Sequence, residues 1–173
     1  YAAAGAGKTK TPAVKLLLLG TLAGMLIAFP TCVTNMATYA LINPSVIRLL
    51  CGVLFAFGLG TVVLTGAELF TGNTLICISV LERKASVIGM LRNWVLVYAA
   101  NFLGSMLVAV ICARFGWLSA GDNALAVYSM KLAINKMTMS FDNAFFMGIL
   151  CNILVTLGVL LALSGKDGVS RFL

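Results

Sequence analysis

A single carboxylate, that of Glu68, lies within the otherwise uncharged run from Leu49 to Leu81. A carboxylate in an apolar run is costly unless it is paired or hydrogen-bonded. The surrounding segment GAELFTGNT is rich in Gly, Thr and Asn, which are residues of turns and helix caps. We therefore expect a turn here, held by Asn73 and by Glu68, the latter through nearby backbone N–H groups. The hydroxyl of Thr71 could donate to or accept from a passing ion or water.

Residues suited to catalysis or metal binding are scarce. The chain has no histidine, the commonest metal ligand and proton shuttle. Five cysteines are present, but none has the spacing of a CxxC motif. We interpret them as small apolar residues of helices and expect no metal, no cofactor and no enzymatic activity. They are Cys32, Cys51, Cys77, Cys112 and Cys151.

The composition indicates that the elements carrying these residues lie in lipid. Of 173 residues, 61% are hydrophobic and 10% are charged, whereas soluble domains average about 25% charged residues. This excludes a soluble globular enzyme, a disordered tail and a nucleic-acid-binding module. The net charge of +7 does not favour nucleic-acid binding, because the basic residues are scattered. At roughly 20 residues per helix, we predict an all-α integral membrane protein of four or five spans.

The apolar runs predict four spans, the second of them broken. That second run is too long for one span and too short for two spans with a loop. Irregular backbone at membrane depth is tolerated only where protein buries it or water reaches it, so a broken helix points to a transport pathway. The alternative is one long tilted helix with a glycine kink. The predicted helices cover about 12–38, 49–67 plus 74–81, 93–113 and 124–164.

Basic residues predict the orientation, because cytoplasmic flanks carry an excess of Lys and Arg. We expect a multi-pass protein of a prokaryotic cytoplasmic (inner) membrane with its N-terminus in the cytoplasm. The predicted cytoplasmic side carries Lys8, Lys10, Lys15, Arg83, Lys84, Arg92, Lys166 and Arg171. The opposite side carries Arg48, Arg114, Lys131 and Lys136.

The string Gly66–Asn73 within the broken helix resembles the signature of the formate/nitrite transporter family. The form Glu-Leu-Phe-Thr-Gly-Asn is similar to that of the hydrosulfide-channel branch. The resemblance covers essentially the whole chain. The further matching stretches, in order, are Lys8, Ala23-Gly24, Arg92-Asn93-Trp94 and Gly148–Asn152.

This resemblance implies an aquaporin-like subunit of six spans, built as two inverted three-helix repeats, in a homopentamer with one pore per subunit. Four of the six expected spans are present, so we expect this chain to be part of a longer protein. The family's fifth helix is also broken and carries a pore histidine. That helix would lie beyond Leu173, which accounts for the absence of histidine.

The resemblance also assigns pore and gating roles. Leu69, Phe70 and Thr71 would form the loop that gates or narrows the pore on the cytoplasmic side. Phe55 and Leu59 would be hydrophobic constriction residues, and their spacing of four places them on one helix face. Ordinary helix packing is the alternative interpretation of this apolar pair.

Three polar residues receive roles in the same way. Lys8 would be a basic residue ahead of the first span, and Lys136 and Asn152 would lie near the pore. The three residues are assigned to anion attraction or to the polar lining of the pore. Lys136 could raise the anion concentration at the outer mouth, and a half-helix starting near Thr74 could direct its positive end at an anion. Asn152 could instead be a structural tie between helices.

Together these features predict a channel or transporter for small monovalent anions such as formate, nitrite or hydrosulfide, with or without a proton. The sequence alone does not select the anion. An aquaporin-like neutral-solute channel shares the architecture, but the chain has no Asn-Pro-Ala motif. A membrane-embedded enzyme and a non-conducting membrane scaffold are two further classes of protein with this kind of composition.

Overall fold

The computed structural model describes residues 1–165, and every regular element in this range is helical. Lys166 and Arg171, which we counted toward the orientation, lie outside the described residues. The elements are α1 (Ala2–Thr9), α2 (Ala13–Thr38), α3 (Pro44–Thr65), α4 (Phe70–Asn73), α5 (Ile76–Leu81), α6 (Val87–Arg114), the 3₁₀ turn η1 (Trp117–Ser119), α7 (Ala124–Met137) and α8 (Phe141–Ser164).

Four described helices are long and apolar enough to cross a membrane, namely α2, α3, α6 and α8. The predicted all-helical membrane architecture is therefore confirmed. Two of the helices begin earlier than predicted because a side chain caps them. The Asn43 Oδ1 atom accepts from the amides of Ser45 at 2.9 Å and Val46 at 3.3 Å, so α3 begins at Pro44 rather than at residue 49.

The third span likewise begins at Val87 rather than at residue 93. Its N-cap is Ser86, whose Oγ accepts the amide hydrogen of Gly89 at 3.0 Å. A hydroxyl at this position satisfies an amide that the helix itself leaves unpaired. The predicted start at residue 93 was wrong because it rested on the apolar run alone and did not consider the capping residue Ser86.

The segment 124–164, which we predicted as one helix with an amphipathic part through Asp142 and an apolar span from Asn143, is two helices. Helix α7 ends at Met137, and the Oγ1 of Thr138 donates to the carbonyl of Ile134 at 2.9 Å. Ser140 is in extended backbone, and α8 begins after it. Hydroxyl side chains offer the backbone such local alternatives to a continuous helix.

The second membrane helix is broken in the glycine-rich segment, as the turn residues predicted. Helix α3 ends at Thr65, and the Gly66 that caps it adopts the left-handed conformation, with a φ of +66° that glycine accommodates readily. The chain is then extended at Leu69 before α4 begins at Phe70. We predicted that the returning segment starts at about Thr74, but it starts earlier, at Phe70. It consists of two short helices of four and six residues.

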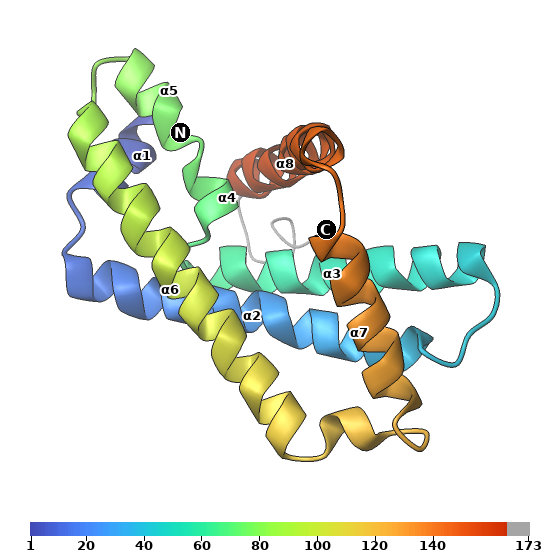
Figure 1. Ribbon diagram of the computed structural model, residues 1–173. Coiled ribbons are helices and arrows are strands. Elements are labelled where there is room, and N and C mark those ends of the chain that lie inside the picture. The colour runs from blue at the N-terminus through green and yellow to red at the C-terminus, as the bar shows by residue number, and fades with distance from the viewer. Residues whose placement is uncertain (166–173) are drawn as a thin grey trace.

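Helices α2 and α6 cross in direct backbone contact (Figure 1). A Cβ atom on Gly24 would collide with the backbone oxygen of Asn101. A Cβ on Gly104 would collide in the same way with the backbone oxygen of Thr21. Small residues allow helices in lipid to approach this closely. We call this contact the α2–α6 seam.

The remaining spans are attached less evenly. Helix α3 packs along α2, where Gly58 leaves room for the ring of Pro30, 2.6 Å from an added Cβ. Helix α8 stands apart from α2 and α6 and meets α4 (Figure 1). Leu59 lies 3.3 Å from an added Cβ on Gly158, and Val159 lies 3.6 Å from one on Gly72. The α8 helix therefore closes one side of the region around the break.

Candidate functional site

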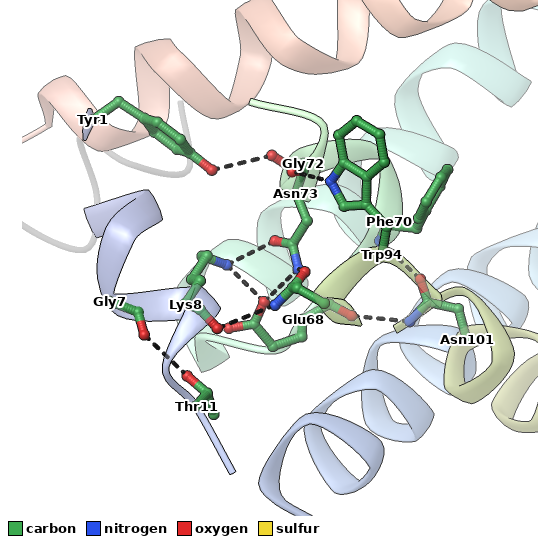
Figure 2. Close-up of polar contacts among 11 residues, drawn as sticks. Tyr1, Gly7, Lys8, Thr11, Glu68, Phe70, Gly72, Asn73, Trp94 and Asn101 are labelled. Atoms are coloured by element: carbon green, nitrogen blue, oxygen red, sulfur yellow. Dashed lines mark hydrogen bonds and ion pairs between the residues drawn. The ribbon is translucent and has the colours of Figure 1, made fainter. Parts of the chain in front are cut away.

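The break is anchored by a triangle of three side chains (Figure 2). Lys8 Nζ donates to Glu68 Oε2 and to Asn73 Oδ1, each at 2.8 Å. Asn73 Nδ2 donates to the same Glu68 oxygen at 2.6 Å. The Glu68 side chain is only 8% exposed and that of Lys8 29%, so the buried carboxylate has both a cation and a neutral donor.

The triangle corrects two predictions. Side chains satisfy the Glu68 carboxylate, not the backbone N–H groups that we expected. Lys8 was assigned to anion attraction, but in the structure its charge is compensated by Glu68. The predicted loop-holding role of Asn73 agrees with its contacts in the triangle.

The first part of α6 adds a second set of contacts to Asn73. Asn93 Oδ1 accepts from Asn73 Nδ2 at 2.9 Å, and Asn93 Nδ2 donates to the carbonyl of Lys8 at 3.3 Å. Trp94 Nε1 donates to the backbone oxygen of Asn73 at 2.9 Å (Figure 2). The end of α4 is therefore bonded to both α1 and α6.

Asn101, at the middle of α6, holds the extended part of the loop. Its Nδ2 donates to the carbonyls of Gly20 at 2.8 Å and Glu68 at 2.9 Å. Its Oδ1 accepts the amide hydrogen of Phe70 at 2.9 Å. Sequence reasoning missed this residue. The sequence did carry a signal for it. Asn101 follows Asn93 by eight positions in an apolar span, and an asparagine in such a span usually bonds to another helix.

The first residue of the chain also reaches the loop. The Tyr1 hydroxyl donates to the carbonyl of Gly72 at 3.3 Å (Figure 2). Burial, reinforced by the nearby Glu68 carboxylate, raises the pKa of the Tyr1 phenol to about 12. The phenol is therefore neutral near pH 7 and keeps the proton that it donates.

Two cavities meet at the break. The smaller, about 230 Å³, adjoins α1 and includes Lys8 and Glu68 in its lining. The larger, about 750 Å³, lies between α2, α3, the loop and α8. Leu59 and Leu69 line both cavities. The polar residues of the larger cavity come from α2 and α4 and are Thr31, Thr34, Asn35 and Thr71.

Four of the five residues predicted to line or gate a pore lie together at these cavities. Phe55, Leu59, Leu69 and Thr71 all line the larger one. Phe70 does not line either. Its ring packs edge-on against two rings of α6, those of Trp94 at 6.3 Å and Tyr98 at 5.4 Å between centroids. Extended backbone at Leu69 directs successive side chains to opposite sides, so Phe70 anchors the loop instead.

The two polar residues assigned to the pore region lie elsewhere. Lys136 is exposed in the last turn of α7. Asn152 Nδ2 donates to the carbonyl of Gly148 at 2.9 Å, within its own helix. Neither is among the described residues that line the two cavities. Cys151, adjacent to Asn152, does line the larger cavity.

The family model described as "Formate/nitrite transporter" matches residues 1–173. The chain belongs to the formate/nitrite transporter family. The resemblance inferred from the broken-helix signature is thereby confirmed.

Named members of the formate/nitrite transporter family are similar along much of the chain. The chain is 32% identical to a "Probable formate transporter" of Methanothermobacter thermautotrophicus, covering 95% of this chain and 66% of that protein. It is 34% identical to the "Formate channel FocA" of Haemophilus influenzae, covering 69% of this chain and 42% of that protein.

A solved structure shares the fold. A "Pentameric formate channel with formate bound" is 30% identical and superposes with a TM-score of 0.81. The match covers 92% of this chain and 64% of that one. The chain thus spans less than two thirds of the length of each of these relatives, from 42% to 66%.

Proposed function

We propose that the protein containing this chain conducts small monovalent anions across the cytoplasmic membrane, with formate as the first substrate to test. The observation that carries the proposal is the pair of cavities that share Leu59 and Leu69 at the broken helix. The relatives named as formate channels or transporters support formate. Nitrite and hydrosulfide are the further candidate substrates, which the Glu-Leu-Phe-Thr-Gly-Asn form suggests.

Selection would take place at the apolar wall between the cavities. Transferring a bare charge past two leucine side chains is costly, because nothing there replaces its hydration. Formate, nitrite and hydrosulfide are conjugate bases of small neutral acids, so each can cross such a barrier together with a proton. We propose that the larger cavity, with Thr71 and Phe55 in its lining, holds the anion before this step.

Anion attraction would depend on the lysines that have no ion-pair partner in the described part of the chain. Lys8 is paired with Glu68, so it adds little net charge at the smaller cavity. Lys136 is exposed and can raise the local anion concentration at the opposite side. The positive end of α4 adds a weaker attraction, because this helix has only four residues.

Gating would involve Leu69. Asn101 fixes the backbone on both sides of Leu69, at the Glu68 carbonyl and the Phe70 amide. The Leu69 side chain can change rotamer without breaking either bond. We therefore propose side-chain movement at Leu69 and Leu59 as the gate, with Thr71 beside it and Phe70 as the fixed anchor.

We also propose a homopentamer with the N-terminus in the cytoplasm. The solved relative is pentameric, and the basic residues are concentrated on the side of α1.

The experiment is flux in liposomes containing the complete protein, comparing formate, nitrite and hydrosulfide with water and glycerol. Leu59→Ala and Leu69→Ala should increase anion flux, and Thr71→Leu should reduce it without loss of the oligomer. Leu103→Ala is the matched control, since this leucine is exposed on α6. Glycerol passage with no anion flux would overturn the proposal in favour of a neutral-solute channel. Absence of any flux in folded pentamers would favour a scaffold.

A further inference from the structure

Two thiols from different helices lie side by side. The Sγ atoms of Cys32 in α2 and Cys112 in α6 are 3.5 Å apart. Both cysteines are free and partly exposed. A disulfide requires its sulfurs to be about 2.05 Å apart, so they must close by roughly 1.5 Å. Rotation of the two side chains can supply a movement of that size.

The contact follows the register of the α2–α6 seam. Ser105 Oγ donates to the carbonyl of Gly24 at 3.2 Å, a pairing of residues 81 positions apart. Cys32 and Cys112 are 80 positions apart and lie about two turns further along both helices. The helices therefore run parallel and in step from the glycine contact to the thiols. Backbone packing at Gly24 and Gly104 fixes the partner of each cysteine.

The thiol pair lies at the end of the seam away from Lys8. Cys112 is two residues before α6 ends at Arg114. Nearby, the hydroxyls of Thr38 and Tyr128 are 3.1 Å apart, so α7 is bonded to the same end of α2. Cys112 therefore lies in the last turn of α6, and Cys32 lies in the second turn before α2 ends at Thr38.

We propose that Cys32 and Cys112 are a site of reversible oxidation that forms an intramolecular disulfide between α2 and α6. The oxidant is a low-molecular-weight disulfide, RSSR. One cysteine thiolate attacks a sulfur of RSSR, forming a mixed disulfide and releasing RS⁻. The second cysteine thiolate then displaces the other RS⁻. The two cysteine protons end on the two RSH molecules, and RSSR is reduced as the cysteine pair is oxidised.

The bond would restrain the element that holds the loop. Asn101 lies on the same seam and joins the Gly20 carbonyl to the Glu68 carbonyl. A covalent link between Cys32 and Cys112 keeps α2 and α6 in register at one end and so limits their separation at Asn101. It also closes a long stretch of chain, which disfavours the unfolded state.

The test uses the complete protein in detergent with Cys51, Cys77 and Cys151 replaced by Ala, so that Cys32 and Cys112 are the cysteines left in residues 1–173. Any cysteine outside this range is also replaced. After incubation with glutathione disulfide, we expect a mass decrease of two hydrogen atoms, a cross-linked peptide joining α2 to α6, and full reversal by dithiothreitol. The midpoint of thermal unfolding should rise on oxidation.

Cys112→Ala in the same background is the control, and it should show one glutathione adduct and no rise in the midpoint. Two glutathione adducts per chain would overturn the proposal, as would a disulfide between chains. A lack of reaction in the folded protein under conditions that oxidise the unfolded chain would also overturn it. The adducts and disulfides are read by mass spectrometry and the midpoint by thermal unfolding, and neither measurement depends on transport.

Discussion

The α2–α6 seam and helix α8 both contain asparagines and glycines, but among the described residues only those of the seam bond to another helix or touch its backbone. Asn101 in α6 bonds to the backbone of α2 and of the broken helix. Asn152 in α8 bonds to Gly148 of its own helix. Glycines of the seam touch the backbone of the opposite helix, whereas an added Cβ on Gly148 would meet no described atom within 4 Å.

The difference is not one of hydrophobicity. The most apolar window of α8 has a mean hydropathy of 2.4 and no buried residue, while that of α2 has 2.1 and 28% of its residues buried. Lipid is as apolar as leucine, so apolar side chains alone do not draw membrane helices together. Small residues and polar bonds decide which helices pack, and the seam has both. Within the described part of the chain, the close backbone contacts and the polar bonds between spans are therefore concentrated at the seam, whereas α8 contributes residues to the lining of the larger cavity.

The largest expected effect is at the closest backbone contact. Gly24→Leu forces a side chain into the backbone of Asn101 and should cost about 3 kcal/mol of unfolding free energy, through overpacking. Gly148→Leu is the matched control and should change stability by less than about 0.5 kcal/mol. Unfolding of both variants in mixed detergent measures the difference. Equal costs would show that the seam is no tighter than α8.

The second test exchanges the two asparagines for alanine. Asn101→Ala leaves the Phe70 amide and the Glu68 carbonyl without their partner, so we expect a loss of about 2 kcal/mol. Asn152→Ala removes one bond within a helix and should cost less than about 0.5 kcal/mol. Protease sensitivity at residues 66–73 should rise only in the first variant. A similar loss in both would contradict the comparison.

The third test concerns the two lysines. Lys8→Met leaves the Glu68 carboxylate without its cation and should cost about 1–2 kcal/mol, moderated by the partial exposure of Lys8. Adding Glu68→Gln should recover part of the loss. Lys136→Met is the exposed control and should leave stability unchanged. If the double variant is no more stable than Lys8→Met, the ion pair is not the cause.

The smallest expected effect is at the helix caps. Ser86→Ala removes the side-chain acceptor of the Gly89 amide and should cost about 1 kcal/mol. Ser140 occupies the corresponding position before α8 but makes no capping bond in the described part of the chain. Ser140→Ala should therefore be neutral within error in the same unfolding measurement. A larger loss of unfolding free energy for Ser140→Ala than for Ser86→Ala would contradict the expectation that α6 depends more on its cap than α8 does.

Sequence reasoning located the break because Gly, Thr and Asn are rare in lipid-facing helices and therefore stand out around Glu68. It did not separate α7 from α8, because Thr138 and Ser140 are two isolated signals with no glycine or proline beside them. It also missed Asn101, since one asparagine in an apolar span has no partner visible in the sequence. The direction of Phe70 depended on an extended residue at Leu69, which no periodicity of the surrounding helices predicts.

The proposed wall formed by Leu59 and Leu69 has a kinetic consequence for the proposed conduction. Each cavity would fill and empty on its own side, so a solute in either compartment would equilibrate with that side before it crosses. The crossing rate is then the product of the occupancy of one compartment and the frequency with which two leucine side chains move apart. Changes elsewhere in the lining alter the occupancy, whereas changes at this wall alter the frequency.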